Sequence, residues 1–451
     1  MTCQLSLTKL IDILAAKTLN LSTAAAAQSC TAITTDTRHL QPGNLFVALR
    51  GENFDGHDFA RMAIAKGAIA VISDSYSATQ LDGVPQLQVE DTLVAYQQIA
   101  RWWREQFQIP VIAITGSVGK TTTKELIAAV LSTRGKVLKT QGNYNNEIGV
   151  PKTLLEMSPE HDYAVIELGM RGSGQIALLT QLVRPTVSVI TNVGTAHIGL
   201  LGSEQAISDA KCELLTEMPS TGVAILNHDD QRLMATAAIW QGQTLTYGLE
   251  GGDLQGTLLD AQTLEVEGVK LPLPLAGRHN ALNYVGALAV AKVLGVDWMP
   301  LAQGLGVELP SGRSQRYDLP NDIVVLDETY NAGLESMLAA LQLLAGTPGA
   351  RHLAVLGTMK ELGERSLEFH QRVGQLAQQL KLDALLILVD DPEAKAIAVG
   401  ADRISECFSS HDTLVKRLEE LVQPGDRLLF KASRSVGLDR VVKQFLAAVA
   451  I

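Results

Sequence analysis

The sequence predicts an α/β protein of three domains. The chain has 451 residues, and a typical domain size of roughly 150 residues suggests about three domains. Hydrophobic residues make up 46% of the chain and charged residues 19%, which allows a sizeable core. Short apolar runs alternate with helical patterns, as in mostly parallel sheets covered by helices on both faces. A strand–loop–helix motif near residue 115 adds the signature of a phosphate-binding loop.

Residues 1–108 form the predicted first domain. We expect a strand over 44–49, an alanine-rich helix near 57–66 and a strand over 68–72. This strand, helix, strand order is typical of an α/β layer. A predicted helix over 93–107 ends just before Pro110 and marks the boundary.

Residues 109–310 form the predicted middle domain, with a mostly parallel sheet of the P-loop type. Its strand candidates are 111–115, 163–168, 186–191 and 223–227, and residues 255–275 alternate in polarity like a hairpin. Residues 311–451 form the predicted third domain, which is Rossmann-like. Its strand candidates are 322–326, 352–356, 384–389 and 427–431.

The composition excludes several classes of protein. A formal charge of −11 and a pI near 5.4 argue against a nucleic-acid-binding surface, since phosphate backbones favour basic patches. Four scattered cysteines show no C-x-x-C spacing, so neither a disulfide framework nor a cysteine-type zinc site is expected. No signal peptide and no apolar stretch of about 18 residues is evident. We therefore expect a cytoplasmic protein without a membrane span.

The segment Gly116-Ser117-Val118-Gly119-Lys120-Thr121 lies between a predicted buried strand and a predicted helix over 124–131. Backbone N–H groups and a helix N-terminus attract phosphate in this arrangement. Lys120 can reach the outer phosphates and the Thr121 hydroxyl can hold Mg²⁺. Ile114 stands where the full Walker A pattern has its first glycine, so an ordinary glycine turn is the alternative.

Two residues with suitable chemistry follow neighbouring strands of the same domain. Glu167 ends the strand 163–168, and His197 follows the strand 186–191. The carboxyl ends of parallel strands meet at one edge, where a carboxylate and an imidazole could hold Mg²⁺ and a substrate group. A solvated strand-end charge and a loop histidine without a role are the alternatives.

Lys211 lies on the apolar stripe of a predicted helix over 203–218. A lysine there can extend its ammonium to the surface. It can instead have a low pKa and react with CO₂ to give a carbamate, which would offer an oxygen ligand to a second metal. Asn280 and Asn283 share a face at the start of a predicted helix ending at Leu294, which suggests a ligand contact or, for Asn280, a helix cap.

Together these segments resemble the Mur ligases, the ATP-dependent amide-forming enzymes of peptidoglycan synthesis. The resemblance spans nearly the whole chain. It includes residues 116–125, 142–151, 167–170, 191–197, 210–211, 277–280, 312–314, 327–332 and 355–363. Four segments (N-x-N-N-E-I-G-V-P, T-Y-N-A, M-K-E-L-G-E-R-S and K-A-S-R-S) are similar to those of members that add D-alanyl-D-alanine to UDP-N-acetylmuramoyl-tripeptide. The selector D-N-P-R of the members that add the third residue is absent.

The resemblance implies a role for each candidate residue. The UDP-sugar-peptide would be bound by Thr37, Arg38, Asp55 and His57 in the first domain and by Asn143, Asn145 and Asn146 at an acceptor channel. ATP would be bound by Gly116, Ser117, Val118, Gly119, Lys120, Thr121, Thr122, His279, Asn280, Asn283, Arg313, Asp327, Glu328 and Tyr330. Two Mg²⁺ ions would be held, one by Thr121 and one by Glu167, His197 and carbamylated Lys211. The dipeptide would lie near Lys431, Ser433 and Arg434. The implied catalytic set is Lys120, Glu167, His197, Lys211 and Arg313.

The sequence departs from the family at three positions of the third domain. Gly333 follows T-Y-N-A where the family commonly has Asn-Pro, Thr358 stands for an Asp, and Glu328 for the second Asp of a pair.

The implied reaction forms an acyl phosphate that the amine of D-alanyl-D-alanine then attacks, in a protein expected to be monomeric. A sister ligase with another amino donor, including the folylpolyglutamate synthetase relatives, is one alternative. A P-loop switch coupled to a partner is a second, and a non-catalytic scaffold is a third.

Overall fold

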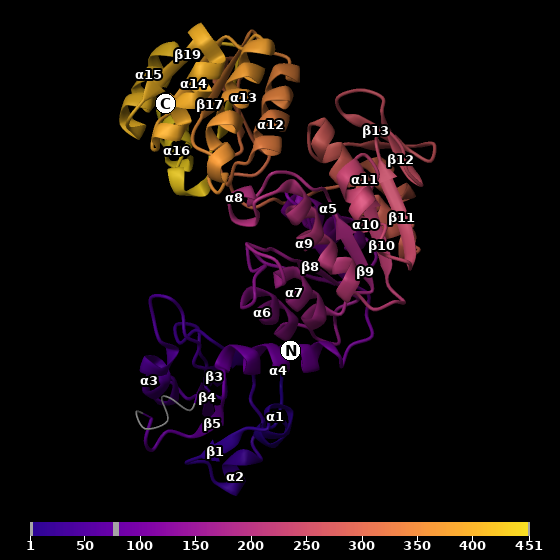
Figure 1. Cartoon of the computed structure of the whole chain (residues 1–451), viewed down its shortest axis with the longest axis vertical. Helices are drawn as coiled ribbons and strands as arrows, with labels where there is room; N and C mark the ends of the chain where they lie inside the picture. The colour runs from indigo at the N-terminus through magenta and orange to yellow at the C-terminus, as the bar shows by residue number, and fades with distance from the viewer. Residues whose placement is uncertain (1–2, 75–80, 450–451) are drawn as a thin grey trace.

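The computed structural model describes residues 3–74 and 81–449. The chain forms three lobes in sequence order along the longest axis of the molecule, each built around its own sheet (Figure 1). The predicted three-domain α/β class is confirmed. The boundaries at 108/109 and 310/311 stay predictions.

The first lobe contains a five-stranded sheet. Its order is β1 (Lys17–Leu19), β5 (Gln86–Val89), β4 (Ala70–Asp74), β3 (Leu45–Val47) and β2 (Ile33–Thr34), with only β1 antiparallel. Its helices are α1 (Leu7–Leu14), α2 (Thr23–Ala26), η1 (Gly56–Phe59), α3 (Ala60–Ala65) and α4 (Thr92–Arg104). The predicted strand–helix–strand order is present in β3, α3 and β4.

The middle lobe contains a nine-stranded sheet. Its order is β14 (Val269–Pro272), β13 (Thr263–Val266), β12 (Leu254–Leu258), β11 (Gln243–Gly248), β10 (Val223–Asn227), β9 (Val187–Ile190), β6 (Val111–Thr115), β8 (Tyr163–Glu167) and β7 (Val137–Lys139). Strands β12, β13 and β14 pair antiparallel, which confirms the hairpin expected over 255–275, and the other strand pairs are parallel.

Alternate residues of the central strands serve two separate cores, because side chains on a strand point to opposite faces in turn. Ile112 and Ile114 pack with α5 (Lys120–Leu131) and α11 (Arg278–Val293) on one face. Val111 and Ala113 belong to the core on the other face, with α7 (Gln175–Val183) and α9 (Glu204–Glu217). The remaining helices of this lobe are α6 (Gly149–Leu155), α8 (Ile198–Leu201), α10 (Gln231–Ala237) and η2 (Met299–Gln303).

The third lobe contains a six-stranded sheet. Its order is β15 (Gln315–Leu319), β16 (Ile323–Asp327), β20 (Asp426–Lys431), β17 (Arg351–Leu356), β18 (Ala384–Leu388) and β19 (Ser405–Phe408), with only β15 antiparallel. Helices α12 (Leu334–Gly346), α13 (Ser366–Gln379) and α14 (Lys395–Ala401) pack on one side, and α15 (His411–Leu421) and α16 (Asp439–Val449) on the other. Short 3₁₀ turns are η3 (Pro320–Asp322), η4 (Gly363–Arg365), η5 (Pro392–Ala394), η6 (Asp402–Ile404) and η7 (Arg434–Val436).

Helix α4 joins the first lobe to the middle one. It packs against α6 and α7, and its Gln97 side chain donates to the Glu147 carbonyl at 3.0 Å. Trp103 Nε1 donates to the Met157 carbonyl at 3.0 Å. The buried Arg104 guanidinium donates to the carbonyls of Val183 and Arg184. These bonds tie the two lobes together from Gln97 to the end of the helix.

Over residues 3–74 and 81–449, no helix combines the length and the apolar character needed to cross a bilayer.

Candidate functional site

The phosphate-binding loop depends on two glycines in backbone conformations that other residues avoid. Gly116 has φ +150°, and a Cβ built there would lie 1.9 Å from Thr191 Oγ1. Gly119 has φ +82°, and its Cβ would lie 2.7 Å from Asn283 Oδ1. Both positions favour glycine. An ordinary glycine turn would not require this close packing against Thr191 and Asn283.

Two residues that directly follow β9 hold the phosphate-binding loop in place through hydrogen bonds. Asn192 accepts a bond from the Val118 N–H at 3.0 Å and donates to the Val118 carbonyl at 2.9 Å. Thr191 Oγ1 donates to the same carbonyl at 2.7 Å. Lys120, the first residue of α5, donates through Nζ to the Gly116 carbonyl at 2.7 Å. A bound phosphate can replace the Gly116 carbonyl as the partner of the Lys120 ammonium, because a charged acceptor makes the stronger hydrogen bond.

Glu167, at the end of β8, lies beside the loop as predicted. Its Oε2 accepts a bond from Thr121 Oγ1 at 2.9 Å, and its Oε1 accepts one from Asn145 Nδ2 at 2.8 Å. The side chain is 3% exposed. Two fixed donors therefore orient a buried anion directly at the start of α5.

Lys211 is buried and does not extend to the surface. Its side chain is 1% exposed and lines the same cavity as Lys120. Burial, and then the charge of Lys120, hold the pKa of Lys211 well below its usual range. Among the described residues, no hydrogen bond to its Nζ is found. The alternative in which the Lys211 ammonium extends to the surface is therefore wrong.

His197 contacts the third lobe. It has φ +66°, a conformation uncommon outside glycine, and its Nδ1 lies 2.6 Å from Glu361 Oε2. Burial lowers the pKa of His197, and the carboxylate of Glu361 acts in the opposite direction. Nearby, Glu335 accepts bonds from the N–H and hydroxyl of Thr195. Two carboxylates of the third lobe thus contact residues of the loop that follows β9.

Most predicted site residues line one cavity of about 970 Å³ between the middle and third lobes. Its lining includes Gly116, Ser117, Val118, Gly119, Lys120, Thr121, Thr122, Asn143, Asn145, Asn146, Glu167, His197, Lys211, His279, Asn280, Asn283, Arg313, Glu328, Tyr330, Lys431, Ser433 and Arg434. Residues up to 318 positions apart in the sequence are therefore brought together, as from Gly116 to Arg434.

The start of α11 supplies the asparagine pair. Asn280 donates to the Ala276 carbonyl at 2.8 Å and reaches Ser314 Oγ at 3.4 Å. The helix begins at Arg278 with Gly277 as its cap, so the interpretation of Asn280 as the cap is wrong. Burial lowers the pKa of His279, which lines the cavity at the second residue of α11.

In the third lobe, Arg313 lines the cavity beside Tyr330. Its guanidinium lies 3.9 Å from the centre of the Tyr330 ring, and the buried Nε has no hydrogen-bond partner among the described residues. The Glu328 carboxylate accepts hydrogen bonds from the N–H and the hydroxyl of Ser314, each at 3.1 Å. Lys431 donates to the Asn331 carbonyl at 3.0 Å and is 4% exposed.

One predicted nucleotide contact in this lobe is not in place. Asp327 does not line the cavity. Its Oδ1 accepts bonds from the N–H and hydroxyl of Thr329, at 3.0 and 2.6 Å, and burial raises its pKa. Asp327 therefore shapes the turn after β16, and its carboxylate is engaged by Thr329.

The predicted substrate residues of the first lobe lie outside this cavity. Arg38 is exposed and pairs with Asp36 at 2.7 Å, and Thr37 accepts a bond from Lys66 through its carbonyl. His57 is buried, with 1% of its side chain exposed. Its Nε2 accepts the Asp74 N–H at 3.1 Å and its Nδ1 lies 2.5 Å from Asp55 Oδ1. His57 thus connects Asp55 to the end of β4 inside the first lobe.

Several residues that support the predicted site residues were not themselves predicted as part of the site. Thr191 and Asn192 brace the loop, Glu335 and Glu361 contact the middle lobe, and Lys124 lies buried below Glu167. Lys124 lies one helical turn after Lys120, and Thr191, Asn192 and Glu361 lie in segments that carry the family resemblance, whereas Glu335 had no such signal.

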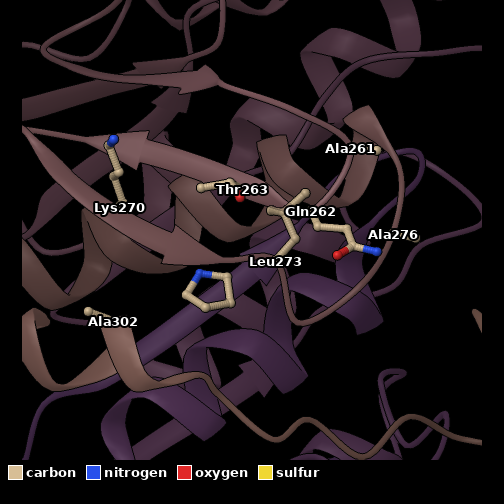
Figure 2. A pocket seen from close by; sticks show the side chains of 8 residues that line it. Ala261, Gln262, Thr263, Lys270, Leu273, Ala276 and Ala302 are labelled. Atoms are coloured by element: carbon tan, nitrogen blue, oxygen red, sulfur yellow. The ribbon is translucent and has the colours of Figure 1, made fainter.

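A second hollow lies on the β13–β14 hairpin (Figure 2). It has about 520 Å³ and is lined by residues that include Gln262, Thr263, Lys270 and Leu273. It shares no lining residue with the larger cavity, and Lys270 is its only charged side chain among the described residues.

Comparison with protein families matches three segments of the chain. Residues 29–104 match "Mur ligase family, catalytic domain", residues 114–291 match "Mur ligase middle domain", and residues 312–434 match "Mur ligase, glutamate ligase domain".

Among curated proteins, the UDP-N-acetylmuramoyl-tripeptide–D-alanyl-D-alanine ligase of Synechocystis is 61% identical over 92% of both chains. The Escherichia coli protein of the same name is 39% identical over 91% of this chain and 93% of its own. Among solved structures, MurF from Acinetobacter baumannii has a TM-score of 0.90 and 32% identity, covering 99% of both chains. MurF from Thermotoga maritima in complex with ADP has a TM-score of 0.84 and 31% identity, covering 93% of this chain and 97% of its own.

Proposed function

The chain belongs to the Mur ligase family, and from this premise we propose that it joins D-alanyl-D-alanine to UDP-N-acetylmuramoyl-tripeptide with ATP. The product is UDP-N-acetylmuramoyl-pentapeptide, a precursor of peptidoglycan. The observation that carries this proposal is the 61% identity to a curated ligase of that specificity over 92% of both chains. A relative solved with ADP supports the nucleotide.

The reaction needs two steps in one place. The terminal carboxylate of the tripeptide attacks the γ-phosphate of ATP, giving an acyl phosphate and ADP. The amine of D-alanyl-D-alanine then attacks the acyl carbon, loses a proton and expels phosphate through a tetrahedral intermediate. Lys120 and Arg313 approach the cavity from different lobes, so they can offset the charge of the phosphates from both sides. Contact between the lobes would keep water from the acyl phosphate.

The donor set also fits two divalent cations. The Thr121 hydroxyl suits the Mg²⁺ of the triphosphate. Glu167 and His197 would hold a second ion, yet no group of three His, Cys, Asp or Glu side chains able to hold a metal occurs among residues 3–74 and 81–449. A carbamate on the buried amine of Lys211 would add an oxygen ligand at this point. Mg²⁺ bound there would stabilise the charge that develops on phosphate transfer.

The remaining assignments follow the same proposal. Asn143, Asn145 and Asn146 would line the path of the acceptor, and Thr37, Arg38 and Asp55 would hold its UDP-sugar end. Ser433 and Arg434 would lie beside the dipeptide. We place the reaction in the cytoplasm, where ATP is available, and expect a monomer.

One assay tests the function. The protein is incubated with ATP, Mg²⁺, UDP-N-acetylmuramoyl-tripeptide and one of D-alanyl-D-alanine, D-alanine or a diamino acid, and ADP and the ligated mass are measured. Product with D-alanyl-D-alanine alone is expected. Product with only another amine would assign a sister ligase, and ADP release that needs no amine would favour a nucleotide-dependent switch.

A further inference from the structure

Lys124 is a fully buried lysine that the proposed reaction does not use. It lies on α5 one turn after Lys120, has 0% exposure and does not line the cavity. A buried ammonium is costly unless it is paired and hydrogen-bonded. Its partners therefore indicate why this position carries a charge.

Lys124 has three partners. Its Nζ donates to the Thr140 carbonyl at 2.7 Å, lies 2.9 Å from Glu125 Oε1, and lies 4.0 Å from Glu167 Oε2. Glu125 has a second partner in Lys139, which contacts its other oxygen. The four side chains form a cluster of two cations and two anions. Glu167 is the member of this cluster that lines the cavity.

Two routes connect Lys124 to the orientation of Glu167. The first is direct, because the ammonium offsets the carboxylate charge across 4.0 Å. The second passes through Thr140, whose carbonyl Lys124 holds and whose hydroxyl accepts the Glu167 N–H at 3.0 Å. The far end of the carboxylate is held by Thr121 and Asn145. Glu167 is thus fixed at its backbone, its charge and both oxygens.

We propose that Lys124 is a positioning residue, which fixes the carboxylate of Glu167 for a divalent cation without touching substrate. This proposal rests on the metal-binding role of Glu167 in the proposed function. Changes to groups that orient a metal ligand typically cost about 10–100-fold in metal affinity or activity. A lysine that only filled space would affect folding and leave the metal dependence unchanged.

The test measures binding of a non-hydrolysable ATP analogue by calorimetry across a series of Mg²⁺ concentrations, with neither acceptor nor dipeptide present. Lys124→Met should raise the Mg²⁺ concentration for half-maximal binding by about 10-fold or more. Its affinity for the analogue without Mg²⁺ should stay within about twofold, because Lys120 and the loop are intact. Lys124→Gln retains a donor for Thr140 and should show a smaller rise.

Lys139→Met is the matched control, because it removes the other lysine on Glu125 without reaching Glu167. Its Mg²⁺ midpoint should stay within about twofold of the native value, because the Lys139 side chain is 33% exposed and its contact with Glu125 is partly screened by solvent. If Lys124→Met does not fold, Thr140→Val serves instead, since it removes only the hydroxyl that holds Glu167. Midpoints in these variants no higher than in Lys139→Met overturn the proposal. The assay reads nucleotide and metal alone, so it stays interpretable even where no ligated product forms.

Discussion

The substitution Gly116→Ala tests the geometry of the phosphate loop. Gly116 has φ +150°, a region that is essentially restricted to glycine, and occupying it costs an alanine about 1–3 kcal/mol. The new Cβ would also lie 1.9 Å from Thr191 Oγ1, so the hydroxyl must move. Its bond to the Val118 carbonyl at 2.7 Å would then be lost, at a cost of about 1 kcal/mol.

These contributions add to about 2–4 kcal/mol if they are independent. Because 1.4 kcal/mol is a factor of ten, affinity for a non-hydrolysable ATP analogue would fall by about 30- to 1,000-fold if the full cost fell on binding. Any share carried by the unbound protein would appear as a lower free energy of unfolding. The assay therefore measures both quantities, by calorimetry and by urea denaturation.

Gly172→Ala is the matched control in the same lobe, since a Cβ there meets nothing within 4 Å. It should leave both quantities within the error of measurement. Adding Thr191→Ala to Gly116→Ala should recover part of the loss, because the colliding hydroxyl is gone while the backbone conformation remains. Native affinity together with native stability in Gly116→Ala would refute the reasoning.

Three further changes have expected outcomes. Glu361→Ala should lower the Mg²⁺ midpoint of analogue binding about fivefold, because a contact of about 1 kcal/mol no longer competes for His197; an unchanged midpoint would argue against competition. Lys211→Ala should lose more activity than the ~10–100-fold typical of outer-shell changes and recover partly with short carboxylates, whereas full activity would exclude a carbamate. Burial lowers the pKa of His370, so below about pH 6.5 the unfolded chain binds more protons and stability falls. In urea titrations at pH 5 and 7.5, His370→Gln should reduce this fall, and equal falls in both proteins would contradict it.

The strands were predictable because their signal is local. Buried parallel strands are continuous apolar runs, and the middle and third domains follow these runs closely, as in Val111–Thr115 and Ala384–Leu388. The short strands Lys17–Leu19 and Ser405–Phe408 were not predicted. Both have exposed positions, so neither shows a clear apolar pattern.

The site was predictable where side chains follow strand ends, as for Glu167, or form a local motif, as for Lys120. The sequence is less informative where it gives the position of a side chain but not its direction. Asp327 ends a strand as expected, yet the following Thr329 takes its carboxylate. His57 is an expected substrate contact, yet its ring is buried and bonded to Asp55 and Asp74 within the first lobe. The contact of Glu361 with His197 depends on how two lobes meet, which no local pattern encodes.

The packing of helix α4 determines where the chain can be cut into stable fragments. Although it belongs to the first lobe by sequence, it covers α6 and α7 and its Arg104 satisfies backbone carbonyls of the middle lobe. A fragment starting at residue 109 would expose that apolar surface and leave those carbonyls without their donor. We expect such a fragment to aggregate when produced alone and to become tractable when produced together with residues 1–108, the two pieces then purifying as one non-covalent complex.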